Sequence, residues 1–371
     1  MKILILTHTL NTGGAERVGT NIANGLCKLG WEVIVMTHNK GEIAYPLSSH
    51  IRIIWFNDGE SNIIKKRYVI FKQICSAIDD LKPDIIVEIL HVFPHELLLS
   101  RKFTKWKCPV IITEHDSFER PRNAPMSRYL YYKKWYLDRM FDSVTVLTEA
   151  DKNYISHRLK RVKVMYNPLF LDPLQEVPKK ENIVLAVGRL DAWHYKGFDV
   201  LITSWLQIAK EYPHWKLKIV GAGSLESKNY LKNLSKESSQ IIFEEFTTDI
   251  VDEYRRAAVF CLSSRYEGWG LVMVEAMSQG CATIACDYKG RQAECITDGI
   301  DGILCEPDNE VALTDKLRLV LSDSSLREQL QSNALRRAKR FTQEIIVKEW
   351  DNFLRSEISV FRKRQKRHIG D

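Results

Sequence analysis

Two glutamates, Glu267 and Glu275, lie eight positions apart in SRYEGWGLVMVEAMSQG, a stretch that otherwise looks like an apolar core helix. Carboxylates are rarely buried without a partner, so the pair faces solvent or a group that offers donors. Glu267 lies in a glycine-containing turn and Glu275 on the following helix, so both can face the same side. Carboxylates accept hydrogen bonds from vicinal hydroxyls, which suggests a sugar for Glu267 and a ribose for Glu275. Two exposed glutamates in caps or ion pairs remain the alternative.

Cations and glycines occur where a phosphate could bind. In GRLDAWHYKG, Arg189 directly follows a predicted strand and Lys196 precedes the next helix. Two cations there suit a diphosphate leaving group, whose oxygens gain charge as the bond to it breaks. In NTGGAER, Gly13 and Gly14 allow close backbone approach to a phosphate at a helix N-terminus. A nicotinamide site would favour G-x-G-x-x-G and an acidic residue after the second strand, where the chain has Thr37-His38.

Short apolar runs alternate with longer amphipathic segments, a pattern typical of parallel sheets covered by helices. The predicted strands are residues 2–8, 32–38, 51–56, 84–90, 109–115, 143–148 and 162–167, then 182–188, 216–223, 240–246, 259–264, 282–287 and 302–306. The fold class is therefore α/β, with two Rossmann-like doubly wound domains, residues 1–168 and 169–344, facing an interdomain cleft. Residues 342–361 predict one long amphipathic helix, and residues 345–371 are expected to pack back onto the first domain. Ligands of such sheets bind outside the carboxyl ends of the strands.

The bulk composition is that of a globular protein, with 45% hydrophobic and 27% charged residues among 371. No apolar run approaches the ~20 residues of a membrane-spanning helix, and MKILILTHTL lacks the features of a signal peptide. We therefore expect a cytoplasmic location. The eight cysteines form no C-x-x-C and are expected to be reduced core thiols.

The net charge of +7 is unevenly placed. FRKRQKRH, residues 361–368, is either a solvated terminus or a segment attracted to an anionic membrane. SRYLYYKKWYLDRM, residues 127–140, interleaves aromatics with cations and is either a membrane-surface segment or a packing helix. These features favour a lipid-linked acceptor at the inner face of the cytoplasmic membrane, with possible peripheral contact to anionic lipid. No nucleic-acid partner is expected, because no recognition motif accompanies the charges.

The motifs taken together resemble those of the family 4 retaining glycosyltransferases of GT-B fold. GGAER, GRL…KG, GAG, YEGWGLVMVEAMSQG and ITDGIDGILCEPDN follow in the order of that family over essentially the whole chain. The resemblance implies that Arg189 and Lys196 hold the donor diphosphate, which Gly14 approaches from the first domain. It further implies that Glu275 binds the ribose and Glu267 the donor sugar, and that His115 lies near the transferred sugar. Front-face departure and attack would give retention without a protein nucleophile.

The predicted catalytic residues are Glu267, His115, Arg189 and Lys196. The predicted donor-binding residues are Gly13, Gly14, Gly188, Arg189, Lys196, Gly221, Glu267, Gly268, Gly270, Leu271 and Glu275. The chain has no D-x-D motif, so no metal and no other cofactor is expected. FEEFTTD and YKGRQAECI depart from the commoner family sequences.

The expected function is retaining transfer of a hexose or N-acetylhexosamine from a nucleoside diphosphate sugar, with UDP as the expected nucleotide. The acceptor would be a glycan, expected to be lipid-linked, in surface polysaccharide synthesis. A nucleotide-sugar epimerase of the same fold and a non-catalytic nucleotide-sugar-binding subunit are the alternatives. The donor sugar, linkage position and oligomeric state do not follow from the sequence.

Overall fold

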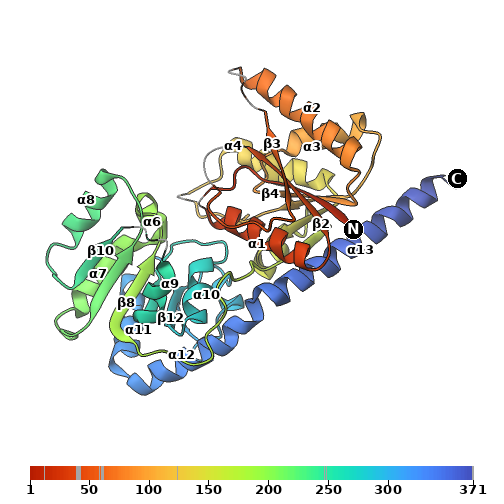
Figure 1. Ribbon diagram of the computed structural model, residues 1–371. Coiled ribbons are helices and arrows are strands. Elements are labelled where there is room, and N and C mark those ends of the chain that lie inside the picture. Colours follow the sequence, from red (N-terminus) through yellow and green to blue (C-terminus); the bar gives the residue numbers. More distant parts are fainter. Residues whose placement is uncertain are drawn as a thin grey trace. The chain divides into compact units, whose positions relative to one another are not determined.

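A computed structural model describes residues 1–11, 13–38, 43–57, 59, 62–122, 124–245, 247 and 249–369. Residues 368 and 369 are described by their backbone alone. Thr12 of the glycine loop, Phe246 and Thr248 of FEEFTTD, and the last two residues of the predicted C-terminal segment lie outside this part. The chain forms two compact units (Figure 1), one of Met1–Pro168 with the chain from Gln343 onward, the other of Leu169–Thr342. Each unit is described by itself.

The first unit holds a parallel sheet in the strand order β3-β2-β1-β4-β5-β6-β7. Its strands are β1 Lys2–Leu6, β2 Glu32–His38, β3 Arg52–Phe56, β4 Ile85–Ile89, β5 Val110–Thr113, β6 Ser143–Val146 and β7 Val162–Val164. Its helices are α1 Gly14–Lys28, α2 Ile63–Leu81, α3 Pro94–Phe103, α4 Arg128–Tyr132, α5 Glu149–Ile155 and α13 Gln343–Ile369. The order reverses between β1 and β4, so residues that follow these strands flank a topological switch point.

The second unit repeats this design in the order β10-β9-β8-β11-β12-β13, again all parallel. Its strands are β8 Glu181–Val187, β9 Lys216–Val220, β10 Ile241–Glu244, β11 Ala257–Leu262, β12 Ala282–Cys286 and β13 Ile303–Cys305. Its helices are α6 Trp193–Lys196, α7 Phe198–Ile208, α8 Leu225–Leu234, α9 Ile250–Arg256, α10 Leu271–Ser278, α11 Glu310–Ser322 and α12 Ser324–Ala338, with 3-10 turns at Leu190–Ala192, Gln292–Glu294 and Lys339–Phe341. The switch point here lies between β8 and β11.

The strands appear in the sequence as apolar runs because most of their residues are buried. Strands β4, β11 and β12 are buried along their whole length, as expected of parallel strands covered by helices on both faces. Each unit has a separate hydrophobic core, built around Ile74 and Ile112 in the first and around Trp205 and Ile219 in the second. All eight cysteines are free, and six of them are buried, in agreement with their prediction as core thiols.

The final helix continues past residue 361, where its apolar spacing ends, to Ile369, because its last residues are charged but have good helix propensity. One helix prediction needs correction. The segment of residues 127–140 is not one regular helix but α4 followed by a π turn, η1 Lys133–Leu137, and a 3-10 turn, η2 Asp138–Met140. Among the described residues, no helix combines the length and apolarity needed to cross a bilayer.

Candidate active site

The loop after β8 carries the first group of predicted donor-binding residues. Gly188 follows β8, and a Cβ on Gly221, which follows β9, would collide with the Gly188 carbonyl oxygen. Only glycine at position 221 lets the two loops lie this close. Arg189 is exposed, and its guanidinium donates to the Tyr195 hydroxyl over 3.4 Å. The cation therefore lies at the carboxyl edge of the sheet, beside the short helix α6.

Lys196 and Glu267, which are far apart in the sequence, form an ion pair. The Lys196 Nζ and Glu267 Oε2 atoms are 2.6 Å apart, and the two side chains are only 14% and 19% exposed. Burial acts to lower the pKa of Lys196, but Glu267 and Tyr195 outweigh it, so that this pKa is raised. Ser264 Oγ also donates to Glu267 Oε2 over 3.3 Å. The structure thus brings two predicted site residues together and keeps the ammonium charged.

Arg265 is a residue that the sequence analysis did not assign. Its guanidinium makes two bonds to the Asp199 carboxylate, of 2.7 and 2.8 Å, and a third of 2.6 Å to Asp308. It also donates to the His194 carbonyl oxygen, and its backbone amide donates to that of Tyr195 over 2.8 Å. Arg265 therefore ties the turn before Glu267 to the loop that carries both predicted cations. The sequence signal for this contact is the arginine in SRYEGWG, Arg265, together with Asp199, which follows Lys196 by three positions.

The turn into α10 depends on glycine. Gly270 has a φ of 88°, in the left-handed region that favours glycine, and precedes Leu271, the first residue of α10. Gly268 is buried. These positions let the chain turn sharply between Glu267 and the helix, which is why the two glutamates lie on different elements.

Glu275 is enclosed within the second unit. Its side chain is buried, with the residue only 1% exposed, and its Oε2 atom accepts a hydrogen bond of 3.0 Å from the Tyr254 hydroxyl. Glu267 and Glu275 thus have different partners, a lysine and a tyrosine. Of the alternative, two exposed glutamates in caps or ion pairs, Glu267 keeps the ion pair but is only partly exposed, whereas Glu275 is buried.

The glycine loop of the first unit opens α1. A Cβ on Gly13 would overlap the Glu16 carboxylate, whereas the Cβ position of Gly14 has no heavy atom within 4 Å. The Gly13 amide donates to the Tyr45 hydroxyl over 3.3 Å, and the Arg17 guanidinium lies 5.3 Å from the centre of the same ring. Gly14 therefore leaves its backbone approachable from one side, as the phosphate-binding prediction requires.

His115 follows β5 of the first unit. One of its ring nitrogens, Nε2, is 3.0 Å from Thr113 Oγ1. Burial lowers the pKa of His115 to about 4, although the neighbouring Glu114 carboxylate acts to raise it. The imidazole is therefore neutral near pH 7 and can accept or donate a hydrogen bond without carrying charge.

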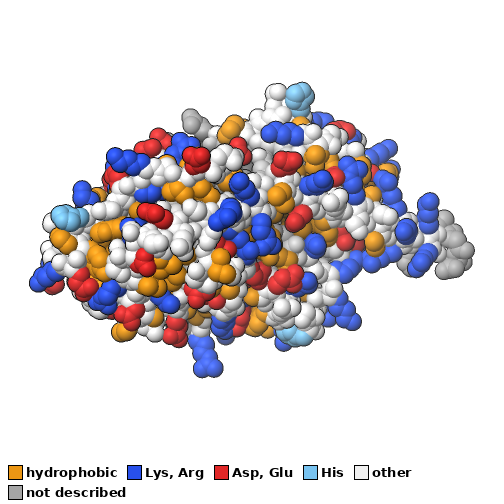
Figure 2. Space-filling model, turned by 90° about the horizontal axis from the view of Figure 1, so that it is seen from below, with side chains coloured by type: hydrophobic (Ala, Val, Ile, Leu, Met, Phe, Trp, Pro, Cys, Tyr) orange, Lys and Arg blue, Asp and Glu red, His pale blue; other side chains and the backbone are white. Residues whose placement is uncertain are grey.

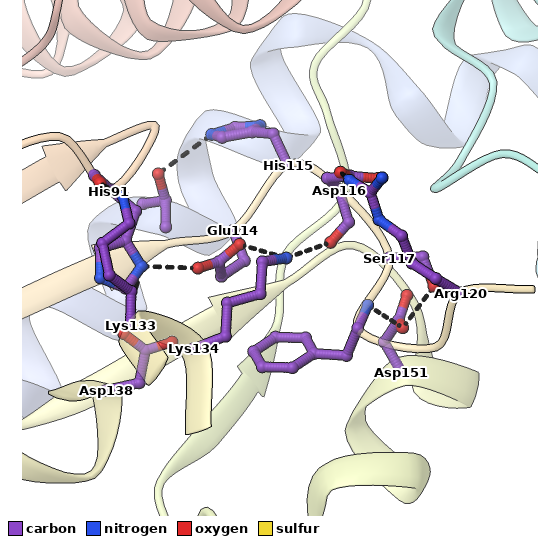
Figure 3. Close-up of polar contacts among 12 residues, drawn as sticks. His91, Glu114, His115, Asp116, Ser117, Arg120, Lys133, Lys134, Asp138 and Asp151 are labelled. Carbon is purple, nitrogen blue, oxygen red and sulfur yellow. Dashed lines mark hydrogen bonds and ion pairs between the residues drawn. The ribbon is translucent and has the colours of Figure 1, made fainter. Parts of the chain in front are cut away.

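A buried lysine fixes the turn around His115. Lys134 Nζ lies 2.6 Å from Glu114 Oε2 and donates to the Asp116 carbonyl oxygen over 3.0 Å (Figure 3). It therefore holds the residues on both sides of His115. The Asp116 side chain, in turn, pairs with Arg120.

His91, Glu114 and Asp138 offer the atom types that could hold a metal ion, and these atoms lie within 4.8 Å of one another. His91 Nδ1, however, is already 2.7 Å from Glu114 Oε1 and 3.2 Å from Asp138 Oδ1. Lys134 Nζ also contacts the Glu114 carboxylate, at Oε2. Burial raises the pKa of Asp138, whereas the pKa of Glu114 is lowered to about 2, because Lys134 and His91 outweigh the effect of its burial. The ammonium thus takes the place of a metal, and we assign none here.

Comparisons with known proteins identify the family of the chain. Residues 12–172 match the model described as Glycosyltransferase Family 4, and residues 172–337 match Glycosyl transferases group 1. The chain is 31% identical to an α-1,4-N-acetyl-D-galactosaminyltransferase of Campylobacter jejuni, named for an undecaprenol-diphosphate-linked acceptor, over 94% of this chain and 97% of the relative. It is 30% identical to the amylovoran biosynthesis glycosyltransferase AmsD of Erwinia amylovora, over 95% and 99%.

Solved structures share the fold. Sucrose-phosphate synthase of Thermosynechococcus elongatus superposes with a TM-score of 0.82 at 19% identity, covering 97% of this chain and all of that one. Anabaena HepE, solved with UDP and glucose, superposes with a TM-score of 0.78 at 21% identity, covering 96% and 100%. Full-length relatives, both family models and two parallel Rossmann-like sheets lead to one conclusion: the chain belongs to the family 4 glycosyltransferases of GT-B fold.

Proposed function

We propose that this protein is a retaining glycosyltransferase that moves a hexose or N-acetylhexosamine from a UDP-sugar to a lipid-linked glycan in surface polysaccharide synthesis. The Lys196–Glu267 pair beside Arg189 is the observation that carries the proposal. An ammonium has three N–H donors, of which Glu267 takes one, so others can turn toward a diphosphate. Arg189 is always charged and exposed on the same loop.

Each predicted residue has a role in this proposal. Arg189 and Lys196 neutralise the charge that develops on the leaving diphosphate, and the loop of Gly13 and Gly14 lets the Gly14 backbone approach it. Glu267 contacts the donor sugar and Glu275 the ribose. Gly188 and Gly221, in the loops after β8 and β9, and Gly268, Gly270 and Leu271, in the turn into α10, shape the donor site around them.

The proposed transfer needs no protein nucleophile. The bond from the sugar C1 to the phosphate oxygen breaks, an acceptor hydroxyl bonds C1 on the same face, and the leaving oxygen takes the hydroxyl proton. The His115 imidazole, which is neutral near pH 7, orients the transferred sugar. Arg189 and Lys196 take the place of a divalent ion, so the reaction is proposed to be metal-independent.

Relatives guide the choice of substrates. The Campylobacter relative is named for transfer to an undecaprenol-diphosphate-linked glycan, and AmsD for amylovoran biosynthesis, while HepE was solved with UDP. We therefore propose a UDP donor and a lipid-linked acceptor, with the protein peripheral at the inner face of the cytoplasmic membrane.

A binding panel of UDP, GDP and ADP, with and without EDTA, tests the donor site. Of the three nucleotides, we expect only UDP to raise the melting temperature of the protein, and we expect the same rise in the presence of EDTA. Arg189→Ala and Lys196→Ala should weaken UDP binding by about tenfold or more, and the surface change Lys210→Ala should not. Binding of none of the nucleotides would contradict the proposal. Isomerisation of the donor without an acceptor would favour an epimerase, and an inverted anomer in the product would overturn retention.

A further inference from the structure

Three neighbouring segments of the first unit form a surface that the donor site does not use. We define the aromatic–basic face as residues 63–72 of α2, 95–103 of α3 and 128–136 of α4 and η1. The Phe71 and Phe103 rings are 5.6 Å apart, which joins α2 to α3, and Figure 1 shows these two helices side by side. His95 stacks on Tyr129 and Tyr132 at 6.2 and 6.1 Å, which joins α3 to α4. The three segments are therefore one continuous surface.

Large apolar side chains are concentrated on this face. Nine of the 23 exposed large hydrophobic residues in the described part of the chain lie within these 28 residues, namely Ile63, Ile64, Tyr68, Leu99, Phe103, Tyr129, Tyr131, Tyr132 and Tyr136. Ile64 is 76% exposed, Phe103 69% and Ile63 67%. Single exposed hydrophobic residues are ordinary, but a contiguous patch marks an interaction site.

The same face carries the positive charge of the protein. It contains nine lysines and arginines, of which only Lys134 is buried, against one carboxylate, Glu96, which is buried and paired with Arg67 at 2.7 Å. These 28 residues have a net charge of +8, against +7 for the whole chain. Two of their cations pair with carboxylates outside the three ranges, Arg101 with Asp142 and Lys134 with Glu114. Lys72 and Lys133 lie over the rings of Tyr68 and Tyr129, at 4.7 and 5.4 Å, so cations and aromatics are interleaved at short range.

We propose that the aromatic–basic face docks on an anionic lipid bilayer. Tyrosine rings partition to the headgroup level, lysine and arginine stems lie along apolar surface with their charges on anionic headgroups, and Ile63, Ile64 and Phe103 enter the acyl boundary. A protein partner fits less well, because lysine is depleted in protein–protein interface cores. The face extends the predicted segment of residues 127–140 to α2 and α3. The inference rests on the proposed function only in that a lipid-linked acceptor lies in a bilayer.

Vesicle flotation of the full chain tests the proposal, with phosphatidylglycerol-containing and pure phosphatidylcholine vesicles at low and high salt. We expect binding to anionic vesicles that weakens as salt rises. Ile63→Ser/Ile64→Ser should lower the partition coefficient by roughly tenfold or more. The matched control is Leu225→Ser/Val311→Ser, because these residues also begin helices and are 74% and 67% exposed, and it should leave binding unchanged. Lys65→Gln/Lys72→Gln should weaken binding several-fold and reduce its salt dependence.

Several results would overturn this face as the docking surface. They are unchanged binding of Ile63→Ser/Ile64→Ser, equal loss in the control, loss only on deletion of residues 362–371, or capture of an oligonucleotide in place of vesicles. UDP binding, measured on the same samples, separates the two proposals. Vesicle binding without UDP binding would support the face and contradict the donor site, whereas UDP-dependent transfer to a soluble acceptor without vesicle binding would overturn the face alone.

Discussion

At the scale of single residues, Arg265 holds the loop of the proposed donor site through Asp199 and the His194 carbonyl oxygen, without being expected to touch the donor. Arg265→Met should weaken UDP binding and lower turnover by about 10- to 100-fold, because small displacements of positioning groups are costly. Arg265→Lys should recover only part of the lost UDP affinity and turnover, since lysine cannot make the paired hydrogen bonds to Asp199. Calorimetric binding of UDP and steady-state kinetics measure both effects.

A second arginine serves as the control for Arg265. Arg318 makes the same kind of paired bonds to Glu211, at 2.9 and 3.0 Å, on α11 and away from the predicted site residues. Arg318→Met should leave UDP affinity unchanged. Equal losses in the two methionine variants would show that a general loss of stability, not the donor loop, is being measured.

Glu88 gives a prediction about pH. It lies in β4, and burial raises its pKa from 4.5 to about 8, while its Oε2 atom has no hydrogen-bond partner among the described residues. Between these values the unfolded chain loses the proton and the folded protein keeps it, so this group destabilises the fold progressively as pH rises. Glu88→Gln mimics the neutral acid and should gain stability relative to wild type over this range, by up to about 1.4 kcal/mol per pH unit.

Urea unfolding between about pH 5 and pH 8 measures this difference. The surface variant Glu237→Gln provides the baseline. A constant difference between Glu88→Gln and wild type across that range would show that Glu88 is already ionised in the folded protein.

Residue types were easier to predict than residue partners. Arg189, Lys196 and Glu267 are recognisable because charged groups in glycine-rich turns after apolar strands have few structural reasons to be there. That Lys196 contacts Glu267 follows only from the pairing of β8 with β11, which the sequence does not specify. Tyr254, the partner of Glu275, lies on a third element, α9, and this contact could not be predicted from the sequence either.

At the scale of elements, α13 packs against α1 through a glycine. A Cβ on Gly25 would lie 2.7 Å from Val347 Cγ1 and closer still to Cγ2. Gly→Ala in a helix usually stabilises by up to about 1 kcal/mol, but Gly25→Ala should destabilise by about 1 to 3 kcal/mol through overpacking. Val347→Ala should remove most of this penalty in the double variant. Chemical denaturation of the four proteins in this cycle measures the coupling, and additive effects would mean that the helices separate easily.

The limits of element prediction have local causes. All the described strands coincide with predicted apolar runs, because strands buried on both faces need no alternation. The irregular turns of residues 133–140 could not be predicted, because the burial of Lys134 beside Glu114 and of Asp138 beside His91 is a tertiary effect that helical periodicity does not encode. The basic end of α13 likewise has no apolar period, and Figure 2 shows lysine and arginine side chains gathered there beside the grey C-terminal atoms.

At the scale of the whole molecule, the two separate cores lead to a calorimetric prediction, because most of the residues proposed to bind the donor lie in one unit. Because each unit has its own core, we expect thermal unfolding in two transitions instead of one. Arg189, Lys196, Glu267 and Glu275 all lie in the unit of residues 169–342, so UDP should mainly raise the transition of that unit. At a ligand concentration of about 100 times Kd, the gain is about 2.7 kcal/mol, or roughly 5 to 10 °C for a unit of this size.

Gly25→Ala identifies the transitions, because it should lower the melting temperature of the other unit, which contains α1 and α13. Scanning calorimetry of wild type and Gly25→Ala, each with and without UDP, gives four traces in which nucleotide and substitution should move different peaks. If UDP instead raised only the peak that Gly25→Ala lowers, the nucleotide would bind the first unit, and the donor site proposed around Lys196 would be wrong. A single peak that both changes move would mean that the two cores unfold as one cooperative unit, and the division of the chain would then have no thermodynamic counterpart.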